Sequence, residues 1–250
     1  MPHYIYGFLM SMVLAYLTTP FVMKLAWKIG AIDVPKDARR VHKKPIPRLG
    51  GLAIYISFMV TGLLILPLEL PYVRGIFLGG SIIVILGILD DIYNLPAKVK
   101  LLGQLAAAGV LVLFGVKVEI LTNPLGGMII LGKLAIPATL FWVVGITNTL
   151  NFIDGLDGLA AGIAAIAAFT MMLVNLSLEQ ANGALVMALL AGAAIGFLPY
   201  NFNPAKIFMG DTGSMFLGFI LAAQAMEGMV KSATVIALIV PILALGLPIF

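Results

Sequence analysis

The chain has 250 residues, of which 62% are apolar and only 10% are charged, and its mean hydropathy is +1.12. An average soluble domain has about 25% charged residues, so this composition excludes a soluble globular protein, and it is too apolar for a disordered one. The absence of cysteine excludes disulfide frameworks, thiolate metal sites and cysteine nucleophiles. The net charge of +4 would suggest nucleic acid in a soluble domain, but here we read it as membrane topology and expect no nucleic-acid partner.

Apolar segments follow one another along the chain with short polar connections. A membrane-spanning helix needs about 20 apolar residues. Nine segments approach this length, at about 4–26, 50–67, 73–89, 101–116, 136–152, 158–178, 184–199, 212–228 and 233–250. The first lacks the basic start and the cleavage site of a signal peptide, so we count it as a span. The sequence predicts one integral membrane domain over 1–250, an all-α polytopic protein with about nine transmembrane helices.

One connection carries the signals of β-strands instead. Residues 117–137 contain VKVEIL and MIILG on either side of TNPLGG, a turn sequence between clusters of β-forming residues. The pattern predicts a small external β-hairpin, the only strand structure that we expect. Its expected role is to cover the ends of neighbouring helices.

The charges indicate which side of the membrane each connection faces. If the segments alternate, the connections after the first, third, fifth and seventh share one side, which holds 11 of the 15 basic residues. The positive-inside rule makes that side cytosolic and places the N-terminus outside. All seven aspartates fall on the same side, whereas all four glutamates fall opposite. We therefore expect the working face to be cytosolic.

Three of these cytosolic helix ends carry aspartates. Asp90 and Asp91 end the third segment, the run NTLNFIDGLDG covers 148–158, and GDTGS at 210–214 opens the eighth. A carboxylate at the membrane surface is costly unless it is paired or coordinated, so these positions are functional hypotheses. Two adjacent carboxylates also repel each other unless a cation lies nearby, either a lysine or a metal ion.

The available ligands favour a hard cation. Oxygen atoms of aspartate and asparagine dominate, with no cysteine and two histidines in the whole chain. Zinc, copper and iron fit such a set poorly, whereas Mg²⁺ fits it well, with Mn²⁺ as the alternative ion. Because Mg²⁺ completes its shell with water and substrate phosphates, the set also predicts a phosphate substrate. The GDTGS helix start offers backbone N–H groups to an anion, and the glycines of DGLDG allow close approach of a nucleotide.

A structural interpretation stands beside each functional one. Asp154, Asp157 and Asp211 could cap helix N-termini. Asp90 and Asp91 could simply end a helix. The basic stretch from 24 to 48 serves topology and attraction to anionic lipid, apart from Arg48.

Taken together, four stretches resemble the bacterial polyprenyl-phosphate N-acetylhexosamine-1-phosphate transferases. In chain order they read GAIDVPKDARRVHKKPIPRLGGLAI, LDDIYNLPAKVKLLGQ, NTLNFIDGLDGLAAG and NFNPAKIFMGDTGSMFLG. The stretch HKKPIPRLGGLAI is similar to the branch that uses UDP-N-acetylglucosamine. The phospho-N-acetylmuramoyl-pentapeptide transferase branch is the alternative within the family.

The resemblance implies an activity. Members transfer N-acetylglucosamine 1-phosphate, or another N-acetylhexosamine 1-phosphate, from a UDP-sugar to undecaprenyl phosphate and release UMP. The reaction uses Mg²⁺ at the cytosolic face of the bacterial cell membrane and begins the synthesis of cell-envelope glycans such as teichoic acid and lipopolysaccharide O-antigen. The expected partners are therefore the UDP-N-acetylhexosamine, undecaprenyl phosphate and the lipid bilayer. A second copy of the chain, in a homodimer, is a further possible partner.

The resemblance also implies roles for individual positions. Asp90 matches the favoured catalytic carboxylate, with Asp91 and Lys100 beside it. Asn151 and Asp211 match metal ligands. Positions that match substrate-binding residues are Asp154, Asp157, Phe208, Asn148, Asn201 and Arg48. Among them, Asp157 and Phe208 are implied to form the uridine pocket.

One departure from the family concerns length. Family chains continue through a cytosolic loop with a histidine-rich motif, whereas this sequence ends at Phe250, inside its ninth segment. We therefore expect the chain to lack the family's C-terminal part, which puts the activity of the 250-residue piece in question. A secondary transporter with intramembrane acidic residues and a catalytically inactive scaffold are the alternatives from other classes.

Overall fold

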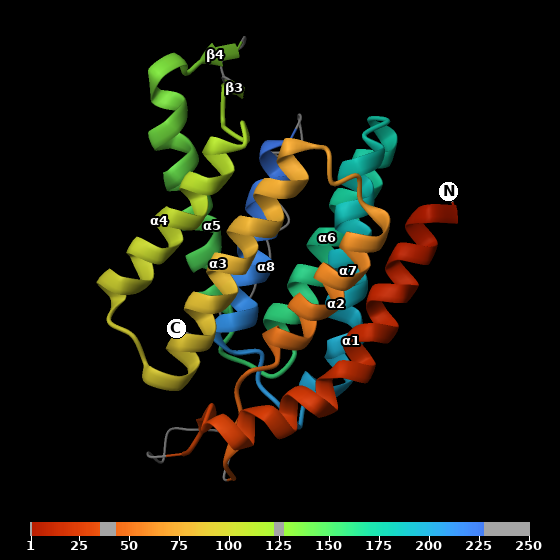
Figure 1. Cartoon of the computed structure of the whole chain (residues 1–250), viewed down its shortest axis with the longest axis vertical. Coiled ribbons are helices and arrows are strands. Elements are labelled where there is room, and N and C mark those ends of the chain that lie inside the picture. Colours follow the sequence, from red (N-terminus) through yellow and green to blue (C-terminus); the bar gives the residue numbers. More distant parts are fainter. Residues whose placement is uncertain (1, 36–43, 123–127, 228–250) are drawn as a thin grey trace.

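The computed structural model describes residues 2–35, 44–122 and 128–227, and these residues are mostly helical. The α-helices of this part of the chain are α1 (Pro2–Ile29), α2 (Gly51–Ile65), α3 (Pro71–Tyr93), α4 (Ala97–Leu113), α5 (Ala135–Ile153), α6 (Leu159–Ser177), α7 (Ala181–Asn201) and α8 (Gly210–Met226). They follow the first eight predicted segments in order, as Figure 1 shows. The ninth predicted segment, 233–250, lies outside the described residues.

Five helices of the described chain are long and apolar enough to cross a membrane by length and composition: α1, α3, α5, α6 and α7. Helix α2 is apolar but shorter, with 15 residues. These helices support the prediction of a membrane protein. The predicted number of nine transmembrane helices stays a prediction.

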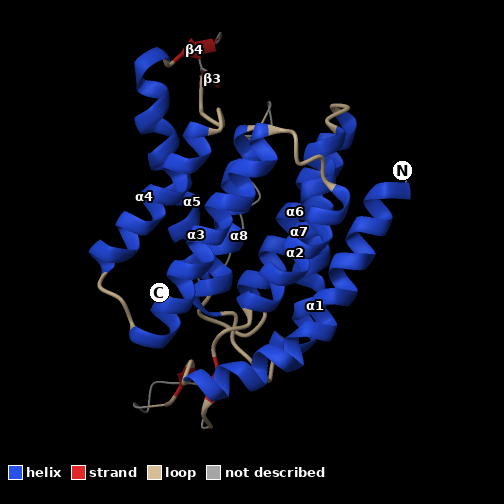
Figure 2. Cartoon of the chain, viewed as in Figure 1, coloured by secondary structure: helices blue, strands red, loops and turns tan. Residues whose placement is uncertain are grey.

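Strands lie at both ends of the helical bundle (Figure 2). The predicted hairpin is present, with β3 (Ile120–Thr122) antiparallel to β4 (Met128–Ile130). The prediction that it is the only strand structure was wrong, because β1 (Ile32–Asp33) also pairs antiparallel with β2 (Ile46–Pro47). Strands of two residues are too short to show an alternating pattern in the sequence. Proline is also rare in strands, so Pro47 gave no indication of one. This second pair brings the chain back from α1 to the start of α2.

Helix α8 lies at the centre of the packing. Its residues from Thr212 to Met226 are all buried, and it packs against α2, α3, α5 and α6. A helix that is buried on every side has apolar residues all around it, and for this reason the sequence of α8 shows no amphipathic face. The N-terminus of α8 is consequently held among the ends of several other helices.

The contact between α3 and α8 depends on Gly87. A Cβ at this position would lie 2.4 Å from the Cα of Thr212 and 2.6 Å from its backbone nitrogen, so no side chain fits without moving α8. We expect Gly87→Ala to destabilise the protein by about 1–3 kcal/mol through overpacking. Thermal unfolding in detergent, followed by circular dichroism, measures the change.

Gly109 on α4 provides the matched control. A Cβ there meets nothing within 4 Å, so Gly109→Ala should leave the unfolding temperature unchanged or raise it slightly, because alanine favours helix over glycine. Equal unfolding temperatures for the two variants would show that α3 and α8 do not pack this closely.

Candidate active site

Four helix ends meet at one end of the bundle and carry the predicted polar residues. The C-terminal end of α3 supplies Asp90 and Asp91, and the first turn of α4 supplies Lys100. The C-terminal end of α5 supplies Asn151, and the N-terminus of α8 supplies Asp211. Because neighbouring helices run in opposite directions, motifs far apart in sequence arrive at the same level (Figure 1).

A lysine joins two of the aspartates. The Nζ atom of Lys100 lies 2.9 Å from Oδ2 of Asp90 and 2.7 Å from Oδ2 of Asp211. The other oxygen of Asp211 accepts a hydrogen bond from Nδ2 of Asn151 at 3.1 Å. We call these residues, Asp90, Lys100, Asn151 and Asp211, the ionic cluster. Sequence reasoning predicted all of them, and the structure brings them into one network.

The ionic cluster shifts the proton affinities of its members. Burial alone would lower the pKa of Lys100, but its two carboxylate partners outweigh this effect and raise the pKa. Burial would raise the pKa of Asp211, but hydrogen bonds involving Asp90, Lys100 and Asn151 outweigh it and lower the pKa. Both shifts favour the charged forms, so the cluster holds an ionised lysine against an ionised carboxylate.

Asp91 does not join the ionic cluster. Its Oδ1 accepts the backbone N–H of Asp211 at 2.9 Å, and its Oδ2 accepts the N–H and the hydroxyl of Thr212 at 3.0 and 2.6 Å. Two of these donors are backbone N–H groups in the first turn of α8, which have no acceptor within the helix, so Asp91 caps that helix from α3. Its predicted catalytic role stays untested, and its geometry indicates that it positions Asp211.

Gly210 makes this cap possible. Its φ is +73°, in the left-handed region that favours glycine. A Cβ there would also lie 2.6 Å from Oδ2 of Asp91. The first glycine of the GDTGS motif therefore serves the turn into α8 and the approach of Asp91, in addition to any ligand.

Arg48 ties the β1–β2 pair to the end of α3. Its Nε donates to the backbone oxygen of Asp91 at 2.9 Å, and its Nη2 donates to Oδ1 of Asn94 at 2.6 Å. Its backbone N–H donates to the oxygen of Ala31, and its backbone pairs with Phe208 in an isolated parallel bridge. Arg48 thus holds three segments together.

A cleft of about 550 Å³ opens beside the ionic cluster. This volume is in the range of small-molecule sites. The predicted site residues that line it are Arg48, Asp91, Asp154, Asp157, Asn201, Phe208 and Asp211. The remaining ones, Asp90, Lys100, Asn148 and Asn151, do not. Asp211 is therefore the one predicted residue that belongs both to the ionic cluster and to the cleft.

Two polar residues of the cleft organise its loops. Oδ2 of Asp157 accepts hydrogen bonds from Nδ2 of Asn203 and from the N–H of Ala205, both at 3.0 Å. Asn201 is 3% exposed, accepts the N–H of Gly158 and donates to the oxygen of Ile207. Asn201 is therefore placed to shape the cleft, and little of its surface can reach a ligand.

Asp154 lies at the C-cap of α5 and lines the same cleft. Burial raises its pKa to about 8, and the negative charges of Asp211 and Asp91 act in the same direction. A carboxyl group in this state would ionise if a cation entered the cleft. Asp154 therefore adds a carboxyl group to the cleft that Asp211 also lines.

Sequence reasoning missed two residues. Gln104 on α4 is 2% exposed and exchanges hydrogen bonds with Asn148 on α5. It follows Lys100 by four residues, so the helical period places both on one face, and this was the available signal. Ser214 accepts a hydrogen bond from Nδ2 of Asn151 at 2.8 Å, and it lies inside the GDTGS motif.

The donor set suits Mg²⁺ better than a metal that needs a full protein cage. Within the described residues, no group of three or more histidine, cysteine, aspartate or glutamate side chains could hold a metal ion. Mg²⁺ needs only one or two carboxylates and takes its other ligands from water and phosphate. Asp211 and Asp90 already share one cation, Lys100, and the amide of Asn151 adjoins them. These residues fit a hydrated Mg²⁺.

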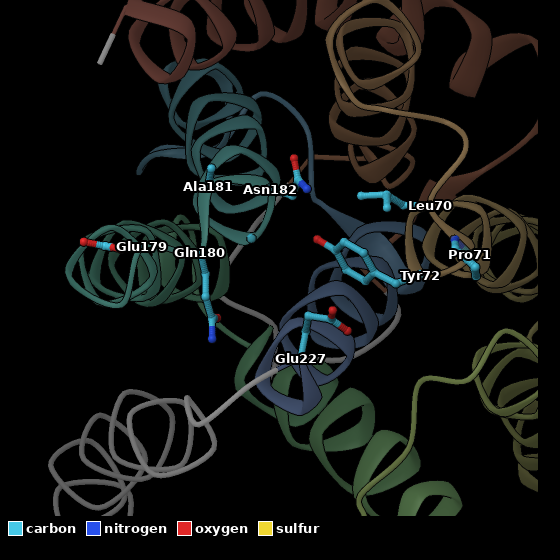
Figure 3. Close-up of a pocket in the computed structure, with 9 residues that line it drawn as sticks. Leu70, Pro71, Tyr72, Glu179, Gln180, Ala181, Asn182 and Glu227 are labelled. Atoms are coloured by element: carbon cyan, nitrogen blue, oxygen red, sulfur yellow. The ribbon is translucent and has the colours of Figure 1, made fainter.

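A second pocket, of about 570 Å³, lies at the other end of the bundle. Figure 3 shows Tyr72 and Glu227 facing it from α3 and the end of α8. Tyr72 lies in the first turn of α3 and Asp91, which lines the cleft, lies in its last turn, so most of the length of this helix separates the two pockets. None of the predicted site residues lines this second pocket.

Comparison with known proteins gives consistent matches. Residues 73–229 match the model of Glycosyl transferase family 4. The chain is 44% identical over 246 residues to the probable undecaprenyl-phosphate N-acetylglucosaminyl 1-phosphate transferase of Bacillus subtilis, which covers 98% of this chain and 68% of that protein. It is 38% identical over 238 residues to the decaprenyl-phosphate N-acetylglucosaminephosphotransferase of Mycolicibacterium smegmatis, covering 87% of this chain and 58% of that protein.

A relative from another branch is less similar. The chain is 35% identical over 239 residues to a phospho-N-acetylmuramoyl-pentapeptide-transferase of Bacillus thuringiensis, covering 88% of this chain and 72% of that protein. The chain thus spans between 58% and 72% of the length of these relatives.

Proposed function

Because the chain belongs to glycosyl transferase family 4, we propose that it transfers N-acetylglucosamine 1-phosphate, or another N-acetylhexosamine 1-phosphate, from a UDP-sugar to undecaprenyl phosphate and releases UMP. This reaction is the first membrane step in making a cell-envelope glycan. The relatives from Bacillus subtilis and Mycolicibacterium smegmatis are named as polyprenyl-phosphate N-acetylglucosamine 1-phosphate transferases, which supports the sugar and the lipid acceptor. The lower identity to the pentapeptide transferase makes that branch the second choice.

The position of Asp211 is the observation that carries the proposal. It lines the cleft and also binds Lys100 in the ionic cluster. A UDP-sugar with its uridine in the cleft, near Asp157 and Phe208, would place its diphosphate beside Asp211. The ionic cluster next to that point holds Asp90 and Lys100 on the α3 and α4 side, where the lipid phosphate would arrive. One residue would thus face both substrates.

Asp211 and Asn151 are the residues that we propose as Mg²⁺ ligands. A bound Mg²⁺ would neutralise the negative charge that develops on the UMP leaving group. Lys100 must then share Asp211 with the metal ion or remain with Asp90 alone. The arrangement supplies positioning and electrostatic stabilisation, which are the main requirements of phosphoryl transfer.

The proposed chemistry is a direct displacement. An oxygen of undecaprenyl phosphate forms a bond to the sugar-linked phosphorus of the UDP-sugar, and the bond between that phosphorus and the UMP oxygen breaks. The second pKa of a phosphate monoester is near 6, so the lipid phosphate is largely ionised at pH 7 and gains little from a base. We therefore assign Asp90 to orienting the lipid phosphate, through the ion pair with Lys100.

The proposal includes the orientation of the protein. The ionic cluster would face the cytosol of a bacterial cell, with the N-terminus of α1 outside. The relatives are bacterial, and the basic residues concentrate in the connections at the ionic-cluster end of the bundle.

A product assay tests the proposal. With UDP-N-acetylglucosamine, undecaprenyl phosphate and MgCl₂ together, the purified protein in detergent should release UMP and form a lipid-linked sugar. Omitting the lipid phosphate, or chelating the metal with EDTA, should stop UMP release, and Mn²⁺ should restore part of it. Parallel reactions with UDP-N-acetylmuramoyl-pentapeptide test the other branch. Uptake of the UDP-sugar into proteoliposomes without UMP release would instead support a transporter.

A further inference from the structure

Gln104 connects three helices beneath the ionic cluster. Its Oε1 accepts a hydrogen bond from Nδ2 of Asn148 at 2.8 Å, and its Nε2 donates to Oδ1 of Asn148 at 3.2 Å. The same Nε2 lies 3.3 Å from the sulfur of Met215 on α8. Nδ2 of Asn148 also donates to the oxygen of Val144, which fixes the amide on α5. Two amides that satisfy each other in this way hold a single mutual orientation.

Gln104, Asn148 and Met215 each lie about one helical turn from a member of the ionic cluster. Gln104 follows Lys100 by four residues on α4, Asn148 precedes Asn151 by three on α5, and Met215 follows Asp211 by four on α8. Residues three or four apart lie on one face of a helix. Gln104, Asn148 and Met215 therefore form a layer directly under Lys100, Asn151 and Asp211, on the same three helices. Gln104 and Met215 are buried in it, and Asn148 is half-buried.

We propose that Gln104 is a positioning residue that sets the spacing of α4, α5 and α8, and thereby the distances from Lys100 to Asp211 and from Asn151 to Asp211. Those distances are 2.7 and 3.1 Å. A hydrogen bond is lost when its atoms separate beyond about 3.5 Å, so a small displacement of α4 would break the network. This inference rests on the proposed function for its effect on turnover.

The proposal extends to Asn148, whose predicted role in substrate binding stays untested. Neither Gln104 nor Asn148 lines the cleft, and both functional atoms of each amide are used by the other. Asn148 is therefore a partner of Gln104 in positioning, rather than a substrate-binding residue. Nucleotide binding should not depend on either side chain.

Gln104→Leu is the first test variant. The substitution removes the amide while keeping similar bulk, and it leaves the amide of Asn148 without its partner. Residues that orient metal ligands typically contribute about 10–100-fold to affinity or activity. We therefore expect kcat to fall about tenfold or more and the Mg²⁺ concentration for half-maximal activity to rise several-fold, with KM for the UDP-sugar unchanged.

Two further variants separate positioning from general stability. Gln104→Asn combined with Asn148→Gln exchanges the two amides and should recover much of the lost activity. Gln224→Leu removes an equally buried glutamine at the opposite end of α8, where it accepts a hydrogen bond from the Tyr72 hydroxyl. If Gln224→Leu changed the Mg²⁺ dependence as much as Gln104→Leu, the effect would be general destabilisation and the proposal would be wrong.

A distance measurement tests the positioning without any turnover. The sequence has no cysteine, so spin labels attach only to introduced cysteines, at exposed Leu102 on α4 and at Gly145 on α5, where an added side chain has open space. Gln104→Leu should broaden or shift the distance distribution from pulsed electron paramagnetic resonance, and Gln224→Leu should not. An unchanged distribution for Gln104→Leu overturns the inference. Failure of the wild-type protein to release UMP, with the distances responding as expected, overturns only the proposed function.

Discussion

Replacing Asp211 with asparagine is expected to abolish Mg²⁺-dependent turnover, with a loss of at least about a hundredfold. Residues that only support metal ligands already contribute about 10–100-fold, so a proposed direct ligand should contribute no less. The substitution keeps the size of the side chain but removes the charge that Lys100 and a metal ion would share. Asn151 would then face a neutral amide in place of the carboxylate that it now contacts.

The assay compares initial rates of UMP release over a range of Mg²⁺ concentrations. Glu119→Gln makes the same chemical change at an exposed residue beside the β3–β4 hairpin, where the carboxylate pairs with Lys117. This control should keep the wild-type rate. Asp211→Asn should still unfold at a similar temperature, because the backbone N–H of residue 211 keeps its bond to Asp91. Full activity of Asp211→Asn at low Mg²⁺ would remove Asp211 from the metal site.

The helical architecture could be predicted because its signal is local. Long apolar runs read as helices, and alternation across a membrane places the aspartate motifs at one end. The ionic cluster follows from that placement, since Asp90, Lys100, Asn151 and Asp211 all lie at helix ends on the same side. The β3–β4 hairpin was predicted for a similar reason, from a turn sequence between β-forming residues.

The roles of individual side chains depend on pairings that sequence order does not show. Asp91 caps α8 across 120 residues, and Arg48 reaches the end of α3 across 43. Nothing in the adjacent pair Asp90 and Asp91 indicates that one faces the ionic cluster while the other faces a helix terminus. That difference arises because successive residues of a helix point about 100° apart. Gln104 was missed because its spacing of four residues from Lys100 does not show that its amide pairs with Asn148 on another helix.

The neighbouring carboxylates Asp90 and Asp91 should respond differently to the same substitution. Oδ1 of Asp90 accepts the N–H of Leu95 at 2.6 Å, and an asparagine oxygen can keep this bond. The asparagine amide would face Lys100, which retains Asp211 as its partner. We expect Asp90→Asn to fold like wild type and to lose about a hundredfold in turnover, as is typical when a reacting group is misplaced by about 1 Å.

Asp91→Asn is the matched comparison. Both oxygens of Asp91 accept hydrogen bonds from the start of α8, so one of these donors would meet the asparagine NH₂ group. A buried N–H without an acceptor costs about 1–3 kcal/mol. The unfolding temperature of Asp91→Asn should therefore fall, whereas that of Asp90→Asn should not. Equal unfolding temperatures would contradict the assignment of Asp91 as the cap.

Nucleotide binding and isotope exchange then define what Asp90 does. Asp90 does not line the cleft, so Asp90→Asn should bind UDP-N-acetylglucosamine with wild-type affinity in isothermal titration calorimetry. Under direct displacement, the wild-type protein should exchange no labelled UMP into UDP-sugar while lipid phosphate is absent, because no intermediate can form. In a two-step route, an aspartate attacks the sugar-linked phosphorus first, and UMP leaves before lipid binds. If the wild-type protein exchanges labelled UMP without lipid and Asp90→Asn abolishes that exchange, direct displacement is wrong. The reaction would then follow the covalent route, with Asp90 as its nucleophile.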